Sequence, residues 1–281
     1  MSGAYRLGVL GRRAWWRPGA AGVLALAALV AFQLTPVSAQ TSPFTGTGID
    51  VSYPNCSASL PPTNFAIVGV TDGRPFTTYK CLPTLWSNAA TAADPATPSA
   101  YFNTGYSGAY GRDVTQVCKS RVSSGFTPPS GLSRHALKQA DQAWEIGCSE
   151  ASYAYGVLKA IRHVPTMLFA DIETGNSWSS NVTLNQYAID GISWGMANPT
   201  KLGYSGSKSG YTGVYSLASA WTAITGSVSW SPTPQVTANW VAGLKGTCPA
   251  SSPFDPGTAA EPTPTWLSQT AVGGIDTDNA C

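Results

Sequence analysis

The chain has 281 residues, with 16 basic and 14 acidic side chains and a formal net charge of +2. The first 39 residues hold four of the arginines and no acid, so the remainder carries 12 basic against 14 acidic groups. This balance lacks the clustered lysine and arginine that proteins use to bind nucleic acid. We therefore expect no nucleic-acid partner.

Residues 1–39 have the pattern of a secretory signal peptide. Four arginines precede or border an apolar run over residues 20–32, and Val37-Ser38-Ala39 is a small-residue cleavage sequence. The apolar run is shorter than the roughly 20 residues that span a bilayer, which favours cleavage over anchoring. We predict a secreted, extracellular protein with no stable membrane insertion after cleavage.

The cysteines are even in number and all lie beyond the predicted cleavage site, which favours disulfides in an exported protein. Six cysteines allow 15 pairings. We favour the sequential pairs because each closes a loop within one region, the last of them holding the C-terminus: Cys56 with Cys81, Cys118 with Cys148, and Cys248 with Cys281. Only two histidines are present, which argues against a histidine-based metal site. We expect no cofactor.

About 240 residues remain after the signal, a length that suits one barrel-sized domain. We expect a short tether over residues 40–47 and a single domain over residues 48–281, acting as a monomer.

Strand-like and helix-like segments alternate along this domain. Strands are expected at residues 48–52, 65–71, 100–104, 166–173, 212–216, 240–242, 266–269 and 275–278. Helices are expected at residues 84–93, at 134–147 with Ser133 as N-cap, at 149–162 with Ser149 as N-cap, and at 184–196, with a short segment at 218–224. The alternation predicts an α/β fold, a single TIM-like (β/α) barrel with few helices after the last strands.

Acids at the ends of predicted strands are the strongest functional signal, because only 14 acids occur in the chain. They are Asp50, Asp171, Glu173 and Asp278. Loops that follow barrel strands build the face where catalysis takes place, so these acids are expected to share one site. Residues i and i+2 of a strand point to the same side, which places Asp171 and Glu173 about 6 to 7 Å apart. Two such carboxyls favour a state in which one is protonated and the other ionised, as general acid catalysis requires.

The motifs, taken in chain order, resemble those of the family 25 glycoside hydrolases, the muramidase-type lysozymes, and of related secreted glycoside-hydrolase-like domains. The matching segments are Gly48-Ile49-Asp50-Val51-Ser52, Asp171-Ile172-Glu173, Gly213-Val214-Tyr215-Ser216, Trp240-Val241-Ala242, and Gln269 followed by Gly274-Ile275-Asp276-Thr277-Asp278. The resemblance covers nearly the whole predicted domain.

This resemblance implies a flattened barrel and a site for N-acetylated cell-wall glycans such as peptidoglycan. It implies that Glu173 is the general acid and that Asp171 stabilises positive charge or orients the substrate N-acetyl group. Asp50 and Asp278 would line the same pocket. Asp276 lies two residues before Asp278 on the same strand face, and the pattern leaves open which of the two enters the pocket.

The chain departs from the family pattern at three places, namely Gly69-Val70-Thr71-Asp72-Gly73, Tyr101-Phe102-Asn103 and Thr270. These departures leave the acids intact and leave two alternatives open: a catalytically inactive glycan-binding or cell-surface domain, and an exported adhesion or structural module. The acid pair itself could instead cap the next segment or bind an arginine.

Four further side chains are candidates for substrate binding. Trp178 lies in a polar loop five residues past Glu173, where an exposed ring could stack on a sugar, although most tryptophans pack in cores. Tyr53, Asn103 and Tyr215 lie at predicted strand ends and could hydrogen-bond the substrate.

Overall fold

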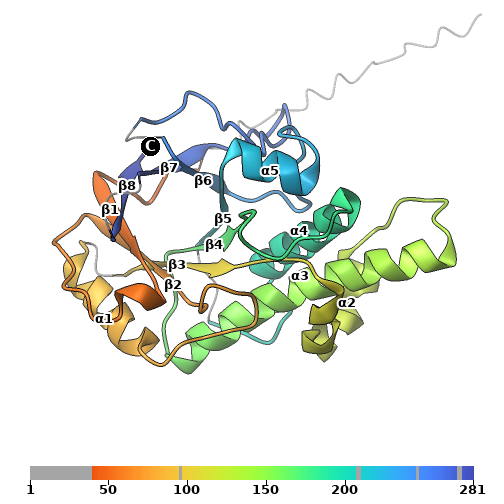
Figure 1. The fold of residues 1–281 in the computed structure, drawn as a ribbon, viewed down its shortest axis with the longest axis horizontal. Coiled ribbons are helices and arrows are strands. Elements are labelled where there is room, and N and C mark those ends of the chain that lie inside the picture. Colours follow the sequence, from red (N-terminus) through yellow and green to blue (C-terminus); the bar gives the residue numbers. More distant parts are fainter. Residues whose placement is uncertain (1–39, 95–96, 207–209, 245–246, 271–273) are drawn as a thin grey trace, which may run out of the picture. The chain divides into compact units, whose positions relative to one another are not determined.

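A computed structural model describes residues 40–94, 97–206, 210–244, 247–270 and 274–281, and residues 40–281 form one compact unit. The predicted signal peptide lies outside the described residues. Within them, eight strands close into a barrel in chain order (Figure 1). The strands are β1 Thr47–Val51, β2 Phe65–Gly69, β3 Ser99–Asn103, β4 Met167–Asp171, β5 Tyr211–Ser216, β6 Ala238–Ala242, β7 Thr265–Thr270 and β8 Asp276–Ala280. The prediction of a single TIM-like barrel is confirmed.

The last strand differs in direction from the others. Strands β1 to β7 pair in parallel, whereas β8 runs antiparallel to both of its neighbours, β1 and β7. The barrel therefore closes through β8. We call the end toward which β1 to β7 run the C-terminal face.

Helices cover the outside of the barrel after the early strands (Figure 1). They are α1 Leu82–Ala92, α2 Gln116–Gly125, α3 Arg134–Ala160, α4 Val182–Ala197 and α5 Ala218–Thr225. In the part of the chain that the structure describes, no helix follows β6, which confirms the expected shortage of helices after the last strands.

The prediction of two helices over residues 134–162 is wrong, because α3 is continuous from Arg134 to Ala160. Ser133 caps it as expected, accepting a hydrogen bond from the Ala136 N–H. Ser149 does not begin a second helix. Its hydroxyl donates to the Glu145 carbonyl one turn earlier, at 2.7 Å, which satisfies the side chain without ending the helix.

Glycines bring α3 and α4 into close backbone contact. A Cβ on Gly147 would lie 1.8 Å from the Ala188 carbonyl oxygen, and one on Gly191 would lie 2.1 Å from that of Trp144. Neither position can hold a side chain at this spacing. The backbones of the two helices are therefore in direct contact at these positions.

Alternation along the strands separates two apolar regions. Outward side chains such as Val68, Leu168 and Val214 pack beneath the helices. Inward side chains such as Phe65 and Phe169 fill the barrel on the side away from the C-terminal face. Phe44, from the segment expected to be a tether, is 6% exposed and packs on Phe65 with ring centroids 4.9 Å apart.

The six cysteines all lie within the described residues and form three disulfides, Cys56–Cys81, Cys118–Cys148 and Cys248–Cys281. The predicted sequential pairing is confirmed, including the link that holds the C-terminus. Among the described helices, none combines the length and apolar character needed to cross a membrane.

Candidate active site

Five acids gather around the upper interior of the barrel, toward its C-terminal face. We call Asp50, Asp171, Glu173, Asp276 and Asp278 the acid cluster. Asp50 lies in β1, Asp171 ends β4, Glu173 follows two residues later, and the other two lie in β8. Asp50, Asp171 and Asp278 are 8%, 3% and 0% exposed, whereas Glu173 and Asp276 are half-buried. The structure thus brings together the four acids singled out in the sequence and adds Asp276.

The expectation that Asp278 ends a strand at the C-terminal face is wrong, because β8 runs antiparallel. Asp276 pairs with Asp50, whereas Asp278 lies two residues deeper, opposite Gly48 and Gln269. Both acids face the barrel interior. Asp276 therefore belongs to the exposed rim of the cluster and Asp278 to its buried floor.

A hydrogen-bonded network fixes the buried floor. The Asp278 carboxyl accepts from Trp240 Nε1 at 2.8 Å and shares a hydrogen bond with Asp50. Asp50 also accepts from Gln269 Nε2 at 2.9 Å, and Gln269 Oε1 accepts from the Tyr215 hydroxyl at 2.6 Å. The predicted site residue Tyr215 thus acts through Gln269, and its ring packs on Trp240 with centroids 4.5 Å apart.

Asp171 and Glu173 form a carboxyl pair, as their spacing in the sequence predicts, and share a hydrogen bond. Asp171 Oδ2 also accepts from Asn103 Nδ2. Asn103 is itself held by Thr71, whose hydroxyl donates to Asn103 Oδ1 at 2.8 Å. The predicted site residue Asn103 therefore contacts the pair directly.

Burial is the main cause of the raised pKa values in the cluster. It raises the pKa of Asp171 well above its usual range, and the neighbouring Glu173 charge adds to the effect. The pKa of Glu173 is raised less, since its hydrogen bond from Asp171 stabilises the ionised form. In the substrate-free protein the shared proton therefore lies on Asp171, whereas a general-acid role needs it on Glu173.

Burial also raises the pKa values of the second carboxyl pair, Asp50 and Asp278. Burial raises the pKa of Asp50 to about 7, partly offset by the hydrogen bond from Gln269. Burial raises the pKa of Asp278 well above its usual range, and the Asp50 charge contributes. A proton on Asp278 can therefore be directed toward Asp50.

Hydrogen bonds hold the backbone at both residues of the acid pair. The Asp171 carbonyl accepts from the Thr104 hydroxyl at 2.6 Å, and the Glu173 carbonyl accepts from Trp178 Nε1 at 2.9 Å. Trp178 is half-buried and packs against the apolar clusters. Its position favours support of the Glu173 loop, while sugar stacking by its ring stays a prediction.

Tyr53 offers an exposed ring at the C-terminal end of β1. It is 45% exposed and packs edge-on against Tyr79, with centroids 6.4 Å apart. Gly73 lies against the Tyr53 ring, since a Cβ there would be 3.2 Å from Cε1. This supported and exposed ring suits the stacking role better than Trp178.

Among the described residues, no basic side chain forms a salt bridge with the acid cluster. The salt bridge that these residues do contain joins Arg112 to Asp113, outside the cluster. The same residues contain no group of three or more histidines, cysteines or acids placed to hold a metal ion.

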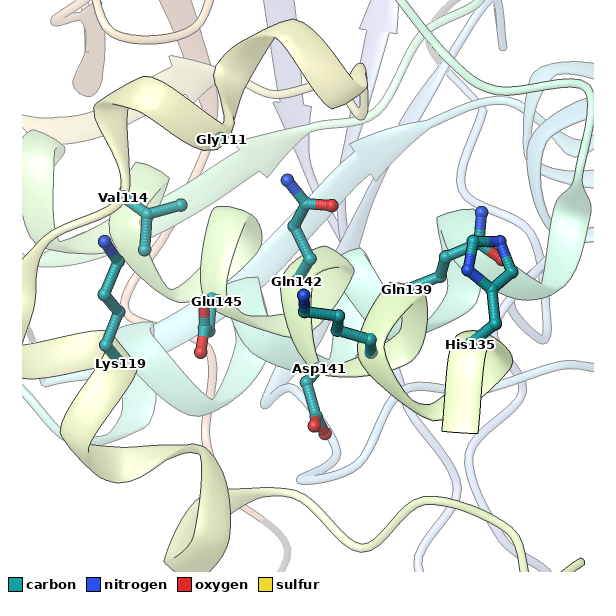
Figure 2. A pocket seen from close by; sticks show the side chains of 9 residues that line it. Gly111, Val114, Lys119, His135, Gln139, Asp141, Gln142 and Glu145 are labelled. Carbon is teal, nitrogen blue, oxygen red and sulfur yellow. The ribbon is translucent and has the colours of Figure 1, made fainter. Parts of the chain in front are cut away.

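A separate pocket of about 580 Å³ lies between α3, α2 and the 3₁₀ helix Gly108–Asp113 (Figure 2). Figure 2 shows Glu145 near Lys119, and Gln142 pointing toward the turn that carries Gly111. Burial raises the pKa of Glu145, and the Lys119 charge opposes this. None of the clustered acids lines this pocket.

Three residues of the site were not singled out as functional from the sequence. Gln269 and Trp240 belong to segments that carry the family resemblance, but only the folded barrel shows that both bond to acids. Tyr101 faces Asp50 from β3. Burial raises the pKa of this tyrosine, and the Asp50 charge adds to the effect. Residues i and i+2 of a strand point to the same side, so an inward-facing Asn103 would have predicted that Tyr101 also lies inside the barrel.

No protein-family model matches the sequence, and no curated protein matches it. Among solved structures, the chain is similar to the crystal structure of the bacterial lysozyme from Streptomyces coelicolor. The two chains are 16% identical, with a TM-score of 0.45, and the alignment covers 85% of this chain and 93% of the lysozyme chain.

Proposed function

We propose that this protein is a secreted glycoside hydrolase that cleaves peptidoglycan or a related N-acetylated polysaccharide. Glu173 is the general acid, and Asp171 is the group that stabilises positive charge or orients the substrate N-acetyl group. The observation that carries the proposal is the hydrogen-bonded pair of Asp171, almost fully buried, and Glu173, half-exposed. The motif resemblance supports the class of glycan.

In the substrate-free pair the proton lies on Asp171, whereas the reaction needs it on Glu173. Substrate that covers Glu173 removes the remaining water, which raises its pKa further. The proton then moves along the hydrogen bond from Asp171 to Glu173 and from Glu173 to the glycosidic oxygen, as the bond from that oxygen to the anomeric carbon breaks. Asp171 becomes ionised at the moment when positive charge develops on the sugar, which it stabilises.

The surrounding residues divide into two roles in this proposal. Asp50 and Asp276 add negative potential near the sugar, whereas Asp278 is fully buried and acts by holding Asp50. Tyr53 provides a stacking surface, and Asn103 keeps the Asp171 carboxyl in place.

Secretion is part of the proposal. Three disulfides are typical of exported proteins. The motif resemblance also points to extracellular glycan.

The test compares wild-type protein with Glu173→Gln on purified peptidoglycan from several bacteria, from about pH 4 to pH 8. Reducing ends and soluble fragments are measured. We expect release by the wild type and a loss of about 100-fold or more in the variant, the usual contribution of a general acid. Glu261→Gln, at an exposed position, is the matched control and retains activity.

The alternative, a glycan-binding domain without turnover, gives a different result. Both wild type and Glu173→Gln would then sediment with insoluble peptidoglycan and release no product. Tyr53→Ala would weaken this binding. An adhesion or structural module would show neither binding nor release.

A further inference from the structure

Glu150 is a buried carboxyl outside the acid cluster. It lies in the middle of α3, is 2% exposed, and forms no salt bridge within the described part of the chain. Burial raises its pKa well above the usual range, which favours the neutral carboxyl. An unpaired acid in such a position is costly, so its contacts need an explanation.

The Glu150 carboxyl accepts the backbone N–H of Gly105. The two oxygens lie 3.2 and 3.4 Å from this nitrogen. Gly105 is buried and belongs to the loop after β3. A Cβ at this residue would lie 2.7 Å from the Ser177 carbonyl oxygen, so the loop fits closely between α3 and the loop after β4.

Both neighbours of Gly105 hold the segment that carries the acid pair. The Thr104 N–H and hydroxyl donate to the Asp171 carbonyl at 3.2 and 2.6 Å. The Tyr106 N–H donates to the Ser177 carbonyl at 2.7 Å. A continuous set of contacts therefore joins the Glu150 carboxyl to residues 171–177.

We propose that Glu150 is a positioning residue for the Asp171–Glu173 pair, acting as the hydrogen-bond acceptor that fixes Gly105 and, through Thr104 and Tyr106, the segment on which both acids lie. The inference depends on the proposed function for its effect on turnover. It does not depend on that function for its effect on the two loops.

Three variants separate the presence of an acceptor oxygen from its position. Glu150→Gln keeps an acceptor oxygen at the same reach, Glu150→Leu removes it, and Glu150→Asp keeps the carboxyl but withdraws its oxygens by one carbon. With soluble cell-wall oligosaccharides, we expect kcat within about twofold of wild type for Gln, and at least about tenfold lower for Leu and Asp, because small displacements of catalytic groups are costly. KM changes little, since Tyr53 is untouched.

Hydrogen–deuterium exchange provides the second measurement. Residues 104–107 and 174–178 exchange faster in the Leu and Asp variants than in wild type. Exchange of these residues in the Gln variant, and of α1 in all three variants, matches wild type. If the Glu150→Leu variant does not fold, the Glu150→Asp variant is compared with wild type in its place. The proposal is overturned if Leu or Asp keeps wild-type kcat and exchange, or if Gln is as impaired as they are. An inactive wild type would reject the proposed function, and the exchange result would still decide whether Glu150 holds the loops.

Discussion

Asp278 lies beside Asp50 on a strand that runs in the opposite direction to its neighbour, deep inside the barrel. Its Oδ1 accepts from Trp240 Nε1 at 2.8 Å, and burial together with the Asp50 charge raises its pKa, which favours the neutral carboxyl. A neutral Asp278 carboxyl can accept from Trp240 with one oxygen and donate toward Asp50 with the other.

An amide at this position reproduces the arrangement. We expect Asp278→Asn to keep the free energy of unfolding at neutral pH at or above the wild-type value, because its oxygen can accept from Trp240 and its NH₂ can donate to Asp50. Asp278→Leu leaves both partners unpaired and lowers that free energy by about 2 to 4 kcal/mol. Urea unfolding of the two variants measures the difference, and equal stability would contradict the inferred direction of the hydrogen bond.

Asp276 influences the pH at which the Asp171–Glu173 pair loses its shared proton. Burial is the main cause of the raised pKa of Glu173, and the negative charge of Asp276 adds to it. Since the pair needs this proton for general acid catalysis, kcat/KM falls as the pH rises through the pKa at which the pair loses it. Asp276→Asn removes the repulsion, so the pair loses its proton, and kcat/KM falls, at lower pH.

The pH profile of reducing-end release at fixed ionic strength tests this shift. Asp190→Asn is the control, because Asp190 lies in α4 outside the acid cluster. A profile that stays in place, or moves to higher pH, would show that Asp276 does not act on the catalytic proton.

Asp190 gives a prediction about stability alone. Burial raises its pKa from 3.8 to about 7, and its Oδ1 accepts the Thr233 N–H at 2.7 Å. Between these pH values the folded protein keeps a proton that the unfolded chain has released, so the free energy of unfolding falls as the pH rises. Asp50 contributes in the same direction over the same range.

Asp190→Asn keeps the acceptor oxygen and removes this titration. Its free energy of unfolding should therefore fall less steeply than that of the wild type between pH 4 and pH 7, with activity unchanged. Urea midpoints at several pH values provide the comparison, and parallel curves would refute the effect.

The Cys118–Cys148 disulfide joins α2 to α3. Cys118 is the one residue of α2 that is fully buried, and two half-buried valines of the helix, Val117 and Val122, pack on the core beside it. Replacing both cysteines by alanine should lower the free energy of unfolding by about 3 to 4 kcal/mol. Urea unfolding tests this value, and a loss below about 1 kcal/mol would mean that α2 is held by other contacts.

The sequence was informative where periodicity and side-chain chemistry agree. Alternation predicted that Asp171 and Glu173 lie on the same side of one strand; β4 ends at Asp171, but the two carboxyls still interact through a hydrogen bond. Strand and helix alternation predicted the barrel, and loop closure predicted the disulfides. The acid pair and the helix and strand patterns depend on residues close together in the chain, and each disulfide closes a loop of no more than 33 residues.

The features that were missed depend on contacts between distant segments. The pattern of β8 is the same for either strand direction, so only its pairing with β1 and β7 reveals that Asp276 lies above Asp278. Ser149 is a suitable N-cap by residue type, but in the folded chain it accepts the Thr115 N–H while bonding back to its own helix. The helix α2 has too few apolar residues for its periodicity to stand out.

The reversed direction of β8 also decides where the two ends of the described domain lie. Phe44 packs at the barrel end away from the acids, and the Cys281 N–H bonds the Trp266 carbonyl near the start of β7, at that same end. A fusion partner or surface linker attached at either end would therefore leave Tyr53 and Glu173 facing outward. Immobilised on a support through its C-terminus, the barrel would present the face that carries Tyr53 and Glu173 to a suspended particle.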